Sequence, residues 1–68
     1  MTEISIKDEY IKLGQAMKLA GLVQNGAQAK EEIVSGNVKV NGETEPRRGR
    51  KLYKGDVFSF QNEEIRIV

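Results

Sequence analysis

The chain has 68 residues, of which 38% are hydrophobic and 6% aromatic, enough for one small domain with a thin core. It contains no cysteine and no histidine, which excludes disulfide bridges, thiolate zinc sites and the usual general base. We therefore expect a single domain over residues 1–68 that is not an enzyme and needs no cofactor or metal.

The charges are distributed unevenly along the chain. Eleven Lys and Arg against ten Asp and Glu give a net charge of only +1. Five of the cations nevertheless lie within residues 47–54, a segment without acids: Arg47, Arg48, Arg50, Lys51 and Lys54. The net charge therefore understates the positive field at one face of the molecule.

No part of the sequence predicts a membrane segment. No stretch approaches the roughly 20 apolar residues that span a bilayer. The N-terminus also lacks the apolar region of a targeting signal. We expect a cytoplasmic protein that is not bound to a membrane.

The first half of the chain predicts a short strand and two helices. Ile4 and Ile6 alternate with polar residues, as in a strand. Apolar residues then recur at helical spacing, which predicts a first helix from Asp8 to Gly21. A second helix is predicted from Asn25, a good N-cap with Gln28 at capping-box spacing, to Gly36.

The second half of the chain predicts a small sheet. Val38 to Val40 alternates as a strand, and Asn41-Gly42 is a strong signal for a type I′ hairpin turn. Further strands are expected at the segments 43–45, 52–53, 57–60 and 65–67. The fold class is therefore α+β, with two short helices packed on a small, mainly antiparallel sheet.

The loop from Pro46 to Lys51 carries the most distinctive chemistry. Its arginines suit bidentate binding of phosphate, and Gly49 permits close approach of a ligand. The alternative is a solvated loop whose cations balance Glu43 and Glu45. In both cases we expect exposed side chains that add little to stability. Tyr53, assigned to the core or its rim, is the only aromatic residue nearby, which argues against a base-stacking platform.

Four segments together resemble the S4-like RNA-binding domain, an αL-type motif. They are Gly21-Leu22-Val23, Ala27-Gln28-Ala29-Lys30, the run from Ser35 to Gly42 with its Val-Lys-Val-Asn-Gly, and Lys54-Gly55-Asp56-Val57. The resemblance covers about Lys12 to Phe60. Among free-standing domains it is similar to the YaaA/YbcJ group of small bacterial proteins.

The resemblance implies that cations on the helices and loops bind RNA. The cationic positions of the family match Lys12 and Lys18 in the first helix, Lys30 in the second helix and Lys39 in the strand. At the start of the second helix this sequence has Asn25 and Gly26, where the family often has a pair that contains arginine. We therefore expect the loop cations to supply the phosphate contacts that this helix lacks. The candidate RNA-binding residues are Lys12, Lys18, Asn25, Lys30, Lys39, Arg47, Arg48, Arg50 and Lys51.

The positions of three of these lysines lead to further expectations. On a helix Lys12 and Lys18 lie about 120° apart, so at most one is expected to share a site with Lys30. The stem of Lys30 either packs along the apolar arc of its helix or holds the cation toward a ligand.

The resulting hypothesis is non-enzymatic binding of structured RNA, expected to be ribosomal, by a monomer through phosphate and shape contacts. One alternative is DNA binding by a helix-turn-helix, although Glu31 and Glu32 stand where a recognition helix needs donors. The other alternative is a ribosome-associated adaptor that binds protein.

Overall fold

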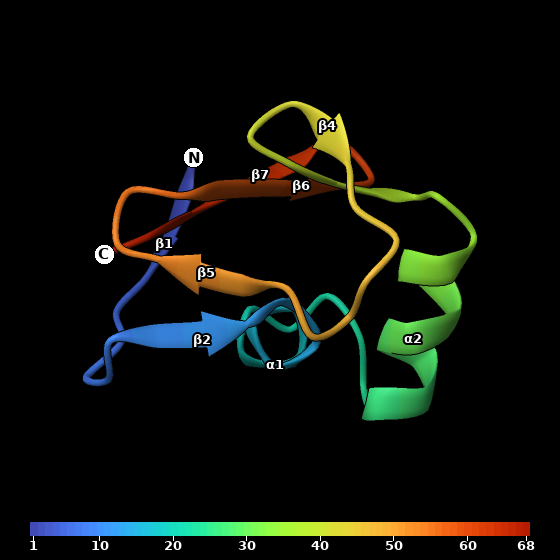
Figure 1. Cartoon of the computed structure of the whole chain (residues 1–68), viewed down its shortest axis with the longest axis horizontal. Helices are drawn as coiled ribbons and strands as arrows, with labels where there is room; N and C mark the ends of the chain where they lie inside the picture. The colour runs from blue at the N-terminus through green and yellow to red at the C-terminus, as the bar shows by residue number, and fades with distance from the viewer.

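The chain folds into two helices and seven strands, and the computed structural model describes all of residues 1–68 (Figure 1). The N-terminal half contains β1, β2, α1 and α2, at Thr2–Ile4, Tyr10–Lys12, Leu13–Leu19 and Gly26–Val34. The C-terminal half contains β3 to β7, at Val38–Val40, Glu43–Thr44, Lys51–Tyr53, Val57–Phe60 and Glu63–Ile67. No helix is long and apolar enough to cross a membrane.

The strands form a five-stranded sheet and a separate two-stranded ribbon. The sheet has the order β1-β7-β6-β3-β4, and only the pair β1–β7 is parallel. The ribbon is the antiparallel pair β2–β5. In Figure 1 the sheet lies above the ribbon and α1, and α2 stands at the right. The predicted α+β class with a mainly antiparallel sheet is confirmed.

One hydrophobic core joins the sheet, the ribbon and both helices. Each helix contributes a narrow apolar side: Leu13, Ala16 and Met17 from α1, and Ala29 and Ile33 from α2. The strands add alternate residues, among them Val38, Val40, Leu52, Phe58, Ile65 and Ile67. The backs of both helices and the outer face of the ribbon therefore remain available for polar contacts.

The first helix begins at Leu13, so the predicted start at Asp8 is wrong. Tyr10, Ile11 and Lys12 form β2 because they pair with β5, where Tyr10 lies opposite Tyr53. Asp8 and Glu9 precede this strand, and the first turn of α1 contains no acid. The spacing of Tyr10, Leu13 and Met17 fits a helix, but pairing with a distant strand overrides it.

Two local signals in the sequence are confirmed. Asn41 and Gly42 both have positive φ, 51° and 89°, as the hairpin between β3 and β4 requires. Asn25 caps α2, because its side chain accepts a hydrogen bond of 2.8 Å from the Gln28 amide. The Gln28 side chain in turn accepts from the Gln24 amide at 2.8 Å, which closes the cap one residue earlier than in a standard capping box.

Candidate functional site

A groove lies where the loop from Pro46 to Arg50, which we call the basic loop, meets one side of α1 and the N-terminal end of α2. We call it the basic groove. No hydrophobic side chain lines it. Its walls are Lys12, Gly14, Gln15, Lys18, Gly26, Arg48 and Gly49. Three cations from three parts of the chain thus face one space: the end of β2, the last turn of α1 and the loop before β5.

Backbone hydrogen bonds attach the basic loop to α1. The Leu13 amide donates to the Arg50 carbonyl at 2.9 Å, and the Gly14 amide donates to the Arg48 carbonyl at 3.0 Å. These bonds satisfy two of the amides that a helix N-terminus leaves without partners. The backbones meet closely, since a Cβ on Gly14 would lie 3.6 Å from the Arg48 carbonyl oxygen. Arg48 is therefore held beside the start of α1.

Lys12 and Lys18 share the basic groove, and the prediction that they occupy different faces of a helix is wrong. Lys12 is the last residue of β2 and the N-cap of α1, so helical periodicity does not apply to it. Lys30 does not line this groove. The late start of α1 is what brings Lys12 and Lys18 together.

Glu45 organises the base of the loop and was missed as a site residue. Its side chain is only 4% exposed. Arg47 donates from Nε and Nη2 to the two carboxylate oxygens, at 3.0 and 3.2 Å, and its backbone amide donates at 3.1 Å. Arg50 donates from Nη1 at 2.6 Å. The alternative in which loop cations balance Glu45 is thus correct for these two arginines.

These contacts stabilise the ionised form of Glu45. The side-chain hydrogen bond from Arg47 is the largest cause and, with that from Arg50, lowers the pKa of Glu45 to about 2 against the opposing effect of burial. The contacts of Arg47 and Arg50 with this buried carboxylate therefore argue against the expectation that all three loop arginines add little to stability. Arg48 is exposed, forms no ion pair and lines the basic groove.

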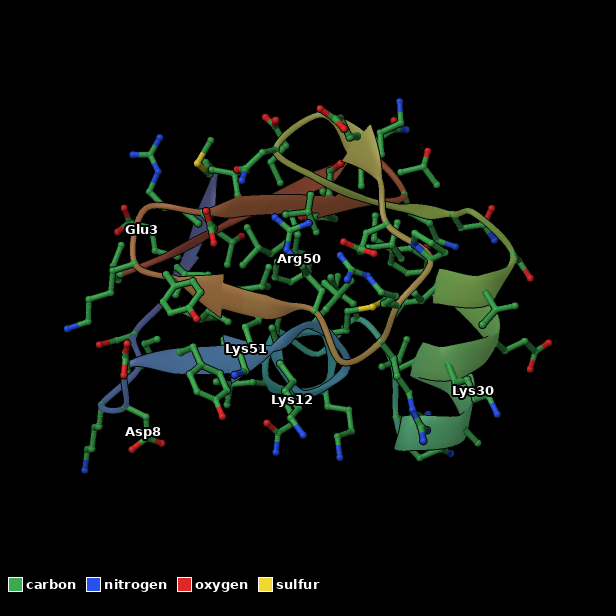
Figure 2. The ribbon with its side chains drawn as sticks, viewed as in Figure 1. Glu3, Asp8, Lys12, Lys30, Arg50 and Lys51 are labelled. Carbon is green, nitrogen blue, oxygen red and sulfur yellow. The ribbon has the colours of Figure 1, made fainter.

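The remaining candidate residues lie outside this cluster or have another role. Asn25 is adjacent to the groove residue Gly26, but its side-chain oxygen is engaged as the N-cap. Lys30 is exposed on α2, and Figure 2 shows it well away from Lys12. Lys39 lies on the outer face of the sheet, between the buried Val38 and Val40. It lines a separate hollow with Ser59 and Glu64.

Lys51 belongs to the ribbon rather than to the loop. It lies opposite Lys12 in the register of β2 and β5, and both are labelled near the centre of Figure 2. Its Nζ lies 4.7 Å from the centre of the Tyr10 ring. The alternation of Tyr10-Ile11-Lys12, matched by Lys51-Leu52-Tyr53, was the signal for this pairing. Tyr10 and the groove residue Gln15 were both missed as site residues.

The basic groove suits binding of anionic oxygens. Arg48 presents a planar fork for two phosphate oxygens, and Lys12 and Lys18 act as point charges. No group of three or more acidic side chains is arranged to hold a metal ion.

Comparisons with known proteins agree with this geometry. The model of the S4 domain matches residues 4–68. The chain is 50% identical over 58 residues to the "Probable ribosome maturation protein RlbA" of Bacillus subtilis, covering 85% of this chain and 82% of that protein. It is 37% identical over 62 residues to the "Putative RNA-binding protein YbcJ" of Escherichia coli, covering 91% and 89%.

A solved structure shows the same fold. The solution structure of YbcJ from Escherichia coli superimposes with a TM-score of 0.76 at 36% identity, over 100% of this chain and 87% of that one. That structure is described as revealing an αL motif involved in RNA-binding.

Proposed function

Because the chain belongs to the S4 domain family, we propose that it binds structured RNA, without catalysing a reaction, and that the RNA is ribosomal. The observation that carries this proposal is the convergence of Lys12, Lys18 and Arg48 on one groove that no hydrophobic residue lines. The names of its relatives support it, since one is called a ribosome maturation protein and another an RNA-binding protein. A protein with this role would act in the cytoplasm, where ribosomal RNA is found.

The proposed mechanism is recognition of the RNA backbone. An A-form duplex has a deep, narrow major groove that side chains do not read, so shape and phosphate contacts dominate. The loop between β4 and β5 holds Arg48 at a fixed distance from Lys12 and Lys18, because its carbonyls are bonded to the start of α1. The backbone positions of the three cations are thus fixed relative to one another, and their exposed side chains can reach successive phosphates. We propose that a monomer suffices, since all three come from one chain.

A salt titration with matched nucleic acids tests this proposal. If each groove cation neutralises one phosphate, log K for an RNA hairpin falls with log salt with a slope of roughly −2 to −3. A DNA hairpin of the same sequence binds more weakly at each salt concentration. Equal affinity for both would favour the helix-turn-helix alternative. No affinity for RNA at low salt would favour the protein adaptor.

Variants locate the contact surface. Replacing Lys12, Lys18 and Arg48 by Ser should remove most of the affinity and flatten the slope by about one unit per lost contact. Lys39→Ser, on the outer face of the sheet, is the matched single-charge control and should change affinity much less than Arg48→Ser. A larger loss from Lys39→Ser would move the proposed site to the sheet. Crosslinking followed by sequencing tests the RNA class, and reads from ribosomal RNA should dominate.

A further inference from the structure

We propose that the outer face of the β2–β5 ribbon is a second RNA contact, which stacks an unpaired base next to the duplex held in the basic groove. The inference rests on the proposed function and deepens it. It assigns a role to the four residues of this face, which we call the tyrosine platform: Tyr10, Lys12, Lys51 and Tyr53.

The register of the ribbon places these four side chains on one face. Tyr10 lies opposite Tyr53, and Lys12 opposite Lys51. The intervening pair, Ile11 and Leu52, faces the core, where Leu52 is fully buried. Because side chains alternate along a strand, the flanking residues point outward.

The two rings form an accessible aromatic surface. Their centres are 6.0 Å apart and their planes are inclined by 53°. Tyr53 is 43% exposed, which excludes the core and fits the other predicted position, at the rim of the core. Lys51 lies over the ring of Tyr10, which leaves Tyr53 as the ring for a stacked base and places an ammonium group beside it. Aromatic rings next to cations are how proteins bind unpaired nucleotides.

Stability of the ribbon does not account for the lysine pair. A cross-strand tyrosine pair stabilises two strands, but like charges directly opposite each other destabilise them. Lys12 and Lys51 are such a pair, and neither forms an ion pair with an acid. A phosphate lying between the two ammonium groups would relieve their repulsion. Two acids lie close to the platform without pairing with these lysines: the Asp56 carboxylate accepts a hydrogen bond from the Tyr53 amide at 2.8 Å, and Asp8 lines a hollow with Tyr10 and Lys12.

The platform is continuous with the basic groove. Lys12 lines the groove and also a neighbouring hollow with Asp8, Tyr10 and Gln15. On the other side, Gly49 lines the groove and a hollow that reaches Lys51 and Tyr53. An RNA strand that leaves a duplex in the groove therefore meets the tyrosine rings next. This order favours RNA with an unpaired segment adjoining a stem.

The chain provides a specific optical probe for the test. It contains two tyrosines and no tryptophan, so all of its tyrosine fluorescence comes from the platform. The ligands are an RNA hairpin with a blunt end, the same hairpin with four unpaired adenosines at its 3′ or 5′ end, and the same overhangs built from abasic nucleotides. The abasic overhang keeps the phosphates and removes only the bases.

We expect the adenosine overhang at one end to bind about five- to tenfold more tightly than its abasic counterpart and to quench the tyrosine fluorescence. Tyr53→Thr, which keeps a β-branched residue in the strand, should abolish this difference and leave affinity for the blunt hairpin unchanged. Tyr53→Phe, which keeps the ring, should preserve it.

Three results would overturn the inference. Equal affinity for adenosine and abasic overhangs at both ends shows that bases do not stack on the platform, even though the blunt hairpin binds. An equal loss for all hairpins in Tyr53→Thr shows a structural role for the ring. Failure of every hairpin to bind defeats the proposed function together with this inference, and the blunt hairpin distinguishes that case from the first.

Discussion

Nη1 of Arg50 lies 2.6 Å from Oε1 of Glu45, a carboxylate that is only 4% exposed. Arg47 approaches the same carboxylate from the solvent side, with its own side chain 72% exposed. Glu45 is thus the buried centre around which the basic loop turns back toward β5. Two of the three loop arginines are thus bound to Glu45, whereas the third, Arg48, forms no ion pair.

Replacing Arg47 and Arg50 together by Ser should destabilise the domain. The buried Glu45 carboxylate would lose both charged partners and keep only the backbone amide of residue 47, and a poorly satisfied buried group costs about 1–3 kcal/mol. Arg48→Ser is the matched control in the same loop, because it removes one exposed charge and no ion pair. Thermal unfolding should show a lower Tm only for the double variant, whereas RNA binding should weaken in Arg48→Ser. Equal Tm values for the two variants would contradict a structural role of Glu45.

The stability of the domain should depend on pH in acid because of the same carboxylate. Folding lowers the pKa of Glu45 from 4.5 to about 2, so the folded state binds fewer protons at this group than the unfolded state. Its contribution is therefore complete above about pH 4.5 and is lost as the pH falls toward 2.

Glu45→Gln separates this effect from that of the other acids. The variant should be less stable than the wild type at pH 7, because an amide binds the two guanidinium groups less strongly. The difference in urea unfolding free energy should shrink between pH 4.5 and pH 2. A difference that stays constant over this range would show that Glu45 is not the group that titrates.

The parts of the fold that the sequence predicted well depend on local chemistry. The Asn41-Gly42 turn needs positive φ, and the cap at Asn25 needs a side-chain oxygen three residues before an amide. Both requirements are met within a few residues, so the residue types alone reveal them.

The parts that were wrong depend on pairing between distant segments. Tyr10-Ile11-Lys12 becomes a strand only because Lys51-Leu52-Tyr53 lies beside it. Glu45 becomes buried only when the loop after β4 folds so that Arg47 and Arg50 both contact its carboxylate. Both errors affected the site, because the first hid the shared position of Lys12 and Lys18, and the second made three arginines look equivalent.

Asn25 offers a way to separate capping from RNA binding. Asn25→Ala should cost about 1 kcal/mol, because the Gln28 amide loses its acceptor at the start of α2. Asn25→Asp keeps an acceptor for this amide and places a negative charge next to Gly26 in the wall of the basic groove. We therefore expect Asn25→Ala to lower Tm with little effect on affinity and Asn25→Asp to do the reverse. Weaker RNA binding by fully folded Asn25→Ala would identify Asn25 as a direct contact.

Gly42 tests the hairpin that joins β3 to β4. Its φ is 89°, a conformation that a β-branched residue adopts only with strain, and a Cβ there would meet no atom within 4 Å. The cost of Gly42→Val is thus conformational and does not come from steric crowding, and we expect the free energy of unfolding to fall by about 1–2 kcal/mol.

Gly42→Asn is the matched control, because Asn tolerates positive φ better than other side chains do. Urea unfolding should give a lower midpoint for Val than for Asn, with the same m-value for both. Since Gly42 does not line the basic groove, RNA affinity of the folded variants should be unchanged. Equal midpoints for Val, Asn and the wild type would show that positive φ at this position does not contribute to stability.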